Sequence, residues 1–327
     1  MLFNDENKIF SVSSEQEFSH LALDIFRYQS NNNPVYREYL HALGAEPADI
    51  CSLAGIPFLP IDLFKKMKVV TGDFIPEAIF RSSGTGGMEK SLHHIMKLAL
   101  YENSFLKSFS LYYGNPSEIT IYALLPSYLE REDSSLVFMA DRLIRTNSRG
   151  RGGFFLDNYD KLLKNIEQSL AMGEKVMLLG VSFALLDLAE RFSPDLSGVI
   201  VMETGGMKGR RKEIVRQELH SILCSHMNID TVHSEYGMTE LLSQAWSQGE
   251  GVFNTPPWMR VIIRDPLDPF AVADRGKTGG INIIDLANIY SCSFIETADL
   301  GVLSEDGSFE VRGRFDSSDI RGCNLLI

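Results

Sequence analysis

Residues 81–91, which read RSSGTGGMEKS after the apolar run AIF, carry the residue types that bind phosphate. Glycines allow the backbone to approach a ligand closely, and successive N–H groups together with Ser and Thr hydroxyls can surround phosphate oxygens. The pattern predicts a phosphate-binding loop, and the alternative is a turn rich in serine and glycine. Walker A loops and dinucleotide-binding turns do not match, because Glu89 stands where each requires glycine.

A second candidate segment, HSEYGMTEL, begins at His233. The carboxylate of Glu240 can hold a magnesium ion, and the Thr239 hydroxyl can contact a phosphate. Tyr236 offers an aromatic face on which a base can stack. Tyr-Gly-Met also occurs in ordinary turns and cores. The segment therefore indicates a function only in combination with other motifs.

Several polar residues are weaker candidates. Asp299 and Arg314 can bond to ribose hydroxyls, although exposed Asp and Arg are more often solvated surface. His93 and His94 are expected in a helix after the phosphate loop, where adjacent histidines cannot share one face, so a metal role is not favoured. His233 can orient a substrate carboxylate or serve as a structural histidine.

Strand and helix patterns alternate through the middle of the chain. Apolar stretches at 119–125, 176–179 and 198–202 are interleaved with helical periodicity at 162–170, 183–190 and 211–223. This alternation predicts an α/β fold with a doubly wound parallel sheet and crossover helices.

The flanking regions have different predicted secondary structure. An amphipathic helix is predicted over 14–29 with Ser14 as its cap, and short strands are predicted at 68–71 and 78–81. After Trp246 the sequence predicts a series of short β segments. The predicted organisation is a helical layer at 1–80 belonging to the same unit as an α/β core at 81–245, followed by a β-rich subdomain and tail at 246–327.

Composition narrows the classes of function. The chain has 327 residues, and 31 Lys and Arg against 43 Asp and Glu give a net charge of −12. This balance disfavours nucleic acid and anionic lipid as partners. The four cysteines have no CxxC spacing, and the sequence has neither a signal peptide pattern nor an 18-residue apolar run, which indicates a cytoplasmic protein without an integral membrane segment.

Taken in order, the Ser/Thr/Gly loop, YGMTE, GKTGG with ETADLG, and GRFDSSDIRG resemble the core motifs of the adenylate-forming superfamily, which includes acyl-CoA synthetases and peptide-synthetase adenylation domains. The resemblance spans residues 81–322. The runs IPFLPIDLFKK, DLANIYSCSFIETADLG and RGCNLLI most resemble the LuxE family of acyl-protein synthetases. The implied fold is the large N-terminal-type domain of these enzymes, without their mobile C-terminal subdomain.

The resemblance implies a role for each matching residue. ATP and Mg²⁺ are the implied cofactors, with Glu240 as the metal ligand, Thr239 at the α-phosphate and Lys90 near the phosphate loop. Tyr236 and Gly237 match the adenine-binding turn. The remaining matches are the loop residues Ser82, Ser83, Gly84, Thr85, Gly86 and Gly87, the adenine-site glycines Gly205 and Gly206, and Asp299 and Arg314 at the ribose.

The predicted activity is ATP-dependent activation of a carboxylic acid, a fatty acid by the resemblance, followed by acyl transfer to a thiol. LuxE-like proteins carry an acyl-accepting cysteine near the C-terminus, which implies Cys323 here, with an acyl-accepting protein as a further partner. Three alternatives stay open: a phenylacetate-type CoA ligase whose C-terminal part is supplied elsewhere, a binding module without turnover, and an acyltransferase that uses a ready-made thioester. A buried structural role for Cys323 is also open.

Overall fold

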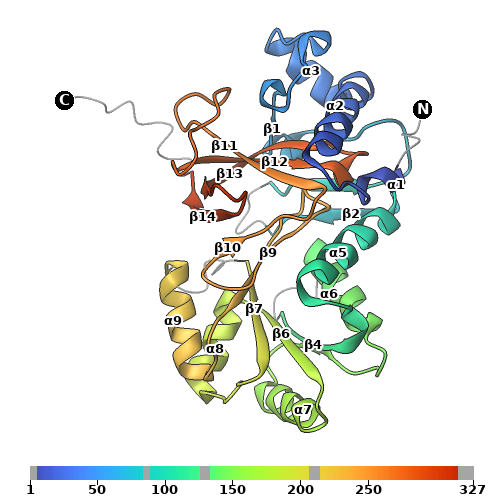
Figure 1. Ribbon diagram of the computed structural model, residues 1–327. Helices are drawn as coiled ribbons and strands as arrows, with labels where there is room; N and C mark the ends of the chain where they lie inside the picture. Colours follow the sequence, from blue (N-terminus) through green and yellow to red (C-terminus); the bar gives the residue numbers. More distant parts are fainter. Residues whose placement is uncertain (1–5, 84–88, 126–132, 206–213, 316–327) are drawn as a thin grey trace, which may run out of the picture. The chain divides into compact units, whose positions relative to one another are not determined.

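The computed structural model describes residues 6–83, 89–125, 133–205 and 214–315 (Figure 1). The chain divides into two compact units. Unit 1 comprises Met1–Asp73 and Pro257–Ile327, and unit 2 comprises Phe74–Pro256. The N-terminal segment therefore folds with the β-rich C-terminal segment, which differs from the predicted assignment of 1–80 to the α/β core.

Unit 2 is built on a mostly parallel sheet in the order β5-β4-β6-β7-β8-β9, with β9 antiparallel to β8. Its elements are β2 (Ala78–Arg81), β3 (Leu92–Ile95), α5 (Leu98–Tyr113), η3 (Pro116–Glu118), β4 (Ile119–Leu124), α6 (Ser135–Thr146), β5 (Gly153–Phe155), α7 (Tyr159–Ala171), β6 (Lys175–Val181), α8 (Ser182–Phe192), β7 (Val199–Thr204), α9 (Arg216–Met227), β8 (His233–Tyr236), β9 (Ala245–Ser247) and β10 (Val252–Phe253).

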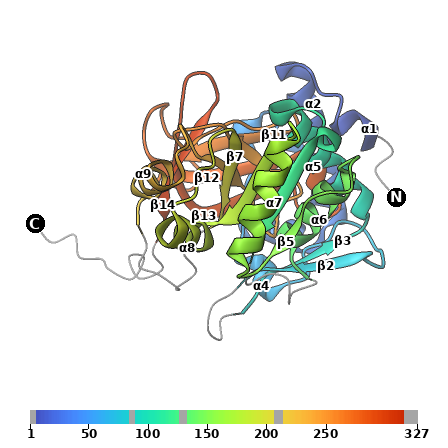
Figure 2. The ribbon, with the colours of Figure 1, turned by 90° about the horizontal axis from the view of Figure 1, so that it is seen from below.

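Helices cover both faces of this sheet. Right-handed crossovers place α6 on one face and α7, α8 and α9 on the other. Tyr159 of α7 packs on Phe192 of α8, while Phe138 of α6 stacks on Tyr101 of α5. Figure 2 shows α8 and α9 side by side. Every residue of β4 is buried, as expected for a parallel strand covered on both faces, and the predicted doubly wound fold is confirmed.

Strands β2 and β3 form a separate antiparallel hairpin, with Phe80 opposite His93. The predicted helix after the phosphate loop is therefore wrong, because His93 and His94 lie in a strand. Burial alternates along β3, with His93 and Ile95 buried, which is the period of a half-buried strand. The loop thus connects two strands of a hairpin.

Unit 1 contains an antiparallel sheet in the order β14-β13-β12-β11, and β1 pairs with β13 in parallel. Its elements are α1 (Glu6–Ile9), α2 (Glu15–Asn32), α3 (Pro34–Ala42), η1 (Pro47–Asp49), η2 (Leu53–Gly55), β1 (Leu59–Pro60), α4 (Leu63–Lys66), β11 (Met259–Arg264), β12 (Gly279–Asp285), η4 (Leu286–Asn288), β13 (Phe294–Leu303) and β14 (Phe309–Arg314).

An aromatic cluster holds α2 and α3 against this sheet. Phe26 meets Tyr36 and Phe294 edge to face, with ring centroids about 6 Å apart in each pair. Ser14 caps α2 by accepting a hydrogen bond from the Glu17 N–H, as the sequence predicts. The strand predicted at 68–71 is wrong, because Thr71 is tied to a loop through the carbonyls of Tyr290 and Ser291.

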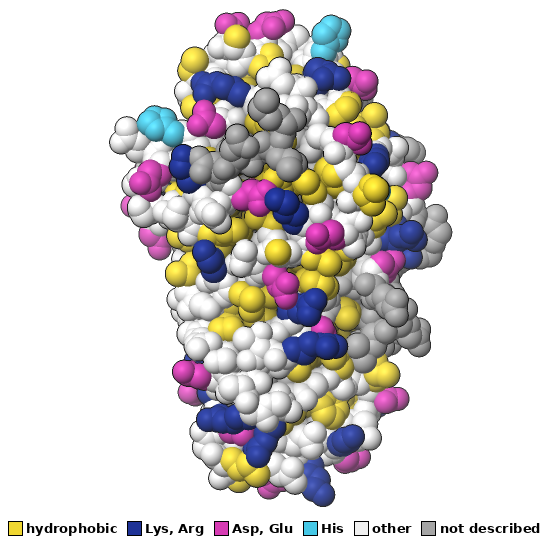
Figure 3. Space-filling model, turned by 90° about the vertical axis from the view of Figure 1, so that its right-hand side faces the viewer, with side chains coloured by type: hydrophobic (Ala, Val, Ile, Leu, Met, Phe, Trp, Pro, Cys, Tyr) yellow, Lys and Arg dark blue, Asp and Glu magenta, His cyan; other side chains and the backbone are white. Residues whose placement is uncertain are grey.

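The described surface carries both signs of charge. On the face seen in Figure 3, Lys and Arg side chains are interspersed with Asp and Glu, and the described residues there form no extended basic field. Among the described helices, none is long and apolar enough to cross a membrane.

Candidate active site

The carboxyl ends of β7 and β8 each carry an acidic side chain in unit 2, Glu203 on β7 and Glu235 on β8. Thr204 ends β7 and pairs in register with Glu235 of β8. The Thr204 hydroxyl donates a hydrogen bond of 2.5 Å to Oε2 of Glu235. In open α/β sheets, ligands bind outside the carboxyl ends of the parallel strands, so this edge is the expected place for a site.

Glu203, one residue before Thr204, is 4% exposed and is surrounded by donors. Its carboxylate lies 3.2 Å from Nε of Arg216 and 3.8 Å from Nε2 of His220, and it accepts a hydrogen bond of 3.2 Å from the Ser182 hydroxyl. Burial opposes ionisation, but the hydrogen bond from His220 and the charge of Arg216 outweigh it and lower the pKa of Glu203. Glu203 is therefore a carboxylate at neutral pH.

Glu235 has the opposite electrostatic environment. Desolvation raises the pKa of the Glu235 carboxyl to about 7. The hydrogen bond from Thr204 opposes this shift, and the negative charge of Glu203 adds to it. A carboxyl group whose pKa lies near neutral pH can act as a proton donor or a proton acceptor. This edge of the sheet can therefore hold or move a proton near neutral pH.

The predicted YGMTE turn follows Glu235 directly. A Cβ on Gly237 would lie 2.3 Å from Oε1 of Glu235, so a larger residue here would have to displace the Glu235 carboxyl. The Tyr236 ring packs against Phe253 with centroids 5.8 Å apart, and Glu240 is 5% exposed. The turn thus carries a buried aromatic ring and a buried carboxylate.

His93 connects this turn to the β2–β3 hairpin. Its Nδ1 lies 2.8 Å from the carbonyl oxygen of Thr239 and donates to it. At the end of the hairpin next to the loop, the Ser82 N–H donates to the Ser91 carbonyl, and the Ser91 N–H donates to the Ser82 hydroxyl. The structure therefore brings the phosphate-loop hairpin and the YGMTE turn together within unit 2.

The predicted site residues fall into three groups. Ser83 and Lys90 are exposed beside the loop, and Gly205 follows β7 with φ +70°, where its carbonyl accepts a hydrogen bond from Ser182. Asp299 and Arg314 lie in unit 1. The predicted residues outside the described part of the chain are Gly84, Thr85, Gly86, Gly87, Gly206 and Cys323.

In unit 1, Asp299 of β13 and Arg314 of β14 are direct cross-strand neighbours. Nε of Arg314 lies 3.1 Å from Oδ1 of Asp299, and the Arg314 side chain is 73% exposed. The two residues predicted to bind ribose therefore form one pair, with the arginine open to solvent.

Burial describes several further residues. Phe105 and Phe109 of α5 are fully buried core residues. His233 lies 3.3 Å from the Tyr113 hydroxyl, and burial and the charge of Lys175 lower its pKa, which fits the structural role. Cys51 is exposed, whereas Cys292 is buried and burial raises its pKa to about 12.

Sequence reasoning missed Glu203, Glu235 and Arg216. A signal was present, because an acidic residue at the end of the apolar run VIVM and another just before Tyr-Gly are unusual in buried strands. Their positions became visible only from the register of β7 and β8, in which Glu203 is level with Ser234 and Glu235 is level with Thr204.

Comparison with solved structures finds proteins that share this fold. The chain is similar to ATP-bound MatB from Rhodopseudomonas palustris, with a TM-score of 0.55, 18% identity and coverage of 72% of this chain and 48% of MatB. It is also similar to 2-hydroxyisobutyryl-CoA ligase in complex with 2-HIB-AMP and CoA, with a TM-score of 0.67, 14% identity and coverage of 94% of this chain and 70% of the ligase.

The likeness establishes the fold: the chain has the α/β architecture of the N-terminal domain of adenylate-forming enzymes. It spans about half the length of the MatB structures that it matches. No protein-family model matches the chain. No curated protein matches it either, so the LuxE-like relationship stays a prediction.

Proposed function

We propose that the protein activates a carboxylic acid with ATP, forming an acyl-adenylate and pyrophosphate. The observation that carries the proposal is the hydrogen bond from His93 to the Thr239 carbonyl, which joins the phosphate-loop hairpin to the YGMTE turn. Both lie in unit 2 with the carboxyl ends of β7 and β8, where nucleotides bind in doubly wound sheets. The fold shared with ATP-bound MatB supports the same reaction class.

The reaction needs positioning and charge neutralisation more than covalent help from the protein. A substrate carboxylate oxygen attacks the α-phosphorus, and the bond from that phosphorus to the bridging oxygen of pyrophosphate breaks. In this proposal Ser82, Ser83 and Lys90 donate to the leaving pyrophosphate, and Thr239 donates to the α-phosphate. The Tyr236 turn with Gly205 holds adenine, and Asp299 with Arg314 holds ribose.

Glu240 is the proposed magnesium ligand. Among the described residues, no group of three or more His, Cys, Asp and Glu side chains could hold a metal ion on its own. Magnesium bound to nucleotides normally takes one or two protein carboxylates and completes its coordination with phosphates and water. A single buried carboxylate beside Thr239 fits that donor set, and the metal would neutralise charge on the phosphates.

The second proposed step transfers the acyl group to a thiol. The resemblance to LuxE-like proteins supports Cys323 as the first acceptor, a fatty acid as the substrate and a protein as a later acceptor. The Cys323 thiolate would attack the acyl carbonyl, forming a thioester and releasing AMP. CoA is the competing acceptor, because it occurs together with 2-HIB-AMP in the similar ligase structure.

Exchange of labelled pyrophosphate into ATP tests the first step, because exchange requires adenylation and no acceptor. We expect acid-dependent exchange in the parent protein, and a loss of about 10²-fold or more in Glu240→Gln, as for removal of one preorganised electrostatic group. Glu167→Gln, on the exposed face of α7, is the matched control and should exchange normally. Full exchange by the Glu240 variant would remove that residue from the mechanism.

Labelling with radioactive fatty acid and ATP tests the second step. We expect a hydroxylamine-labile protein adduct that Cys323→Ser abolishes while pyrophosphate exchange survives. Cys51→Ser, which removes an exposed thiol, is the control and should still be labelled. Adducts that persist in Cys323→Ser would favour another acceptor.

A further inference from the structure

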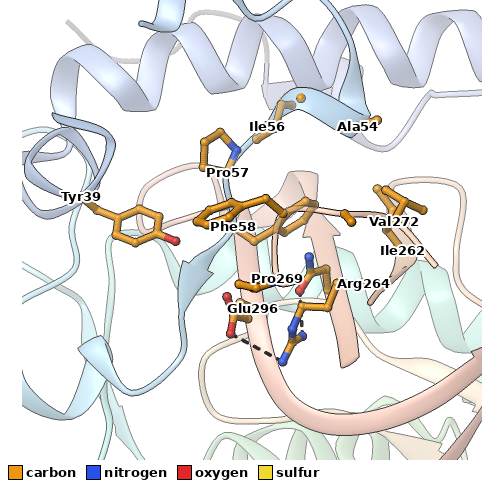
Figure 4. A pocket seen from close by; sticks show the side chains of 14 residues that line it. Tyr39, Ala54, Ile56, Pro57, Phe58, Ile262, Arg264, Pro269, Val272 and Glu296 are labelled. Atoms are coloured by element: carbon orange, nitrogen blue, oxygen red, sulfur yellow. Dashed lines mark hydrogen bonds and ion pairs between the residues drawn. The ribbon is translucent and has the colours of Figure 1, made fainter. Parts of the chain in front are cut away.

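Unit 1 contains a cavity of about 130 Å³ that the proposed reaction does not use (Figure 4). Its polar side chains are Tyr39, Arg264, Asn282 and Glu296, which come from α3, β11, β12 and β13. Apolar side chains such as Ile56 form the walls. A cavity in which apolar walls surround a few converging polar groups is the usual form of a small-ligand site.

Arg264 cannot serve an anionic ligand in this cavity, because its donors are already used. Its guanidinium donates to the Asn282 side chain at 2.9 Å, the Ile281 carbonyl at 3.1 Å and the Thr297 carbonyl at 2.8 Å, and it is 5% exposed. Gly280 lies against the Arg264 side chain, and a Cβ on Gly280 would come within 2.6 Å of Nε of Arg264. This explains why the GKTGG segment needs glycine at that position.

Glu296 is the acceptor that faces the cavity. Its closest contact with Arg264 is 3.5 Å, longer than a good charge-assisted hydrogen bond, and its side chain keeps 25% exposure. Figure 4 shows the Tyr39 hydroxyl and the Glu296 carboxylate on the same side of the cavity. Burial raises the pKa of Glu296 despite Arg264, which indicates that the carboxylate lacks full compensation for its charge.

We propose that this cavity binds a primary ammonium group carried on a short apolar stem, with Glu296 as the charge partner. The ammonium donates to the Glu296 carboxylate, and the aromatic rings of Tyr39 and Phe58 add a cation–π attraction. The stem lies against the apolar wall. The volume suits a group the size of a lysine side chain, which either a free alkylamine or a lysine of a partner protein can supply. This site goes beyond the proposed adenylation and does not depend on it.

Calorimetric titration of the full chain with n-butylammonium, without ATP, tests the proposal. We expect saturable binding, with butyrate and n-butanol at least about tenfold weaker, since each lacks the positive charge. Non-saturable uptake of butylammonium, or equal binding of butyrate, would overturn the assignment. A capped lysine peptide titrated in parallel separates the two sources: tighter binding of the peptide supports a partner lysine, and tighter binding of the free amine supports a small ligand.

Two variants make the test specific. Glu296→Gln keeps the shape of the side chain and should weaken butylammonium binding at least about tenfold. Glu310→Gln on β14, which does not line the cavity, should leave binding unchanged. If Glu296→Gln proves unstable, Ala54→Phe at the exposed rim should block the cavity without touching the ion pair. Unchanged affinity in a folded Glu296 or Ala54 variant would sink the proposal.

Discussion

Charged side chains have different environments in the two units. In unit 2, Glu203 is enclosed at the end of a parallel strand and compensated by Arg216, His220 and a hydroxyl. In unit 1, the Asp299–Arg314 pair bridges two antiparallel strands with the arginine mostly in solvent. Burial raises the cost of leaving a charge uncompensated, whereas an exposed pair can exchange its partner for water or a ligand.

The largest effect is expected where the buried compensation of unit 2 is removed. Arg216→Met should destabilise the protein by about 3 kcal/mol, the lower end of the range for broken buried pairs, because His220 and Ser182 remain near the Glu203 carboxylate. Thermal or urea unfolding of the purified variant measures the change. Arg145→Met, which breaks the exposed pair with Asp141 on α6, is the control and should change little.

An Arg216 variant as stable as the Arg145 variant would contradict the buried character of the Glu203 cluster. Because Arg216 also lies over the Phe253 ring at 5.0 Å, methionine keeps most of the packing and isolates the lost charge.

Glu235 should make stability depend on pH. Its pKa rises from an ordinary 4.5 to about 7 on folding, so between these values the folded protein binds a proton that the unfolded chain releases. Stability therefore falls as pH rises through this window, by roughly 3 kcal/mol in total, and the penalty is absent below it. Glu235→Gln has no such penalty and should be more stable than the parent at pH 8 but nearly equal at pH 4.5.

Melting curves at several pH values check this sign. Glu167→Gln, whose side chain is exposed, supplies a control that should follow the parent at every pH. If the Glu235 variant and the parent kept a constant difference in melting temperature from pH 4.5 to 8, the raised pKa of Glu235 would be refuted.

The doubly wound core was predictable because its signals are local and periodic. Mainly apolar runs such as residues 119–124 are typical of strands or helices that are buried on both sides, and their alternation with amphipathic helices leaves few topologies. The β2–β3 hairpin was not predictable in the same way. The residues after the loop have no strong period, and their strand pairing is fixed by partners upstream of the loop.

The residues of the candidate site likewise divide into those that the local sequence predicts and those that only the fold brings together. Glu240, Thr239 and Tyr236 stand within one short motif, so their proximity follows from the sequence alone. Glu203 and Glu235 are 32 residues apart along the chain and come to the same edge of the sheet only because β7 and β8 pair, with Glu203 level with Ser234 and Glu235 level with Thr204. Likewise, no spacing rule identifies His93 as the residue that contacts the Thr239 carbonyl.

The smallest change in stability is expected at the Asp299–Arg314 pair of unit 1, whose arginine is exposed. Asp299→Ala should alter the free energy of unfolding by less than about 1 kcal/mol, because its partner Arg314 is 73% exposed and water replaces the lost contact. If Asp299 binds ribose, the same variant should weaken ATP binding by about 1.5 to 3 kcal/mol, the contribution of a hydrogen bond to a charged group.

Calorimetry with ATP and Mg²⁺, run beside melting curves without nucleotide, separates these two effects. Glu310→Ala is the matched control, because Glu310 pairs with Arg312 at 3.0 Å on the same sheet and has no proposed role in ATP binding. A loss of ATP affinity confined to Asp299→Ala, with both variants melting like the parent, would mean that the exposed pair of unit 1 serves ligand binding and contributes little to folding. Equal ATP affinity in all three proteins would exclude Asp299 from the nucleotide site.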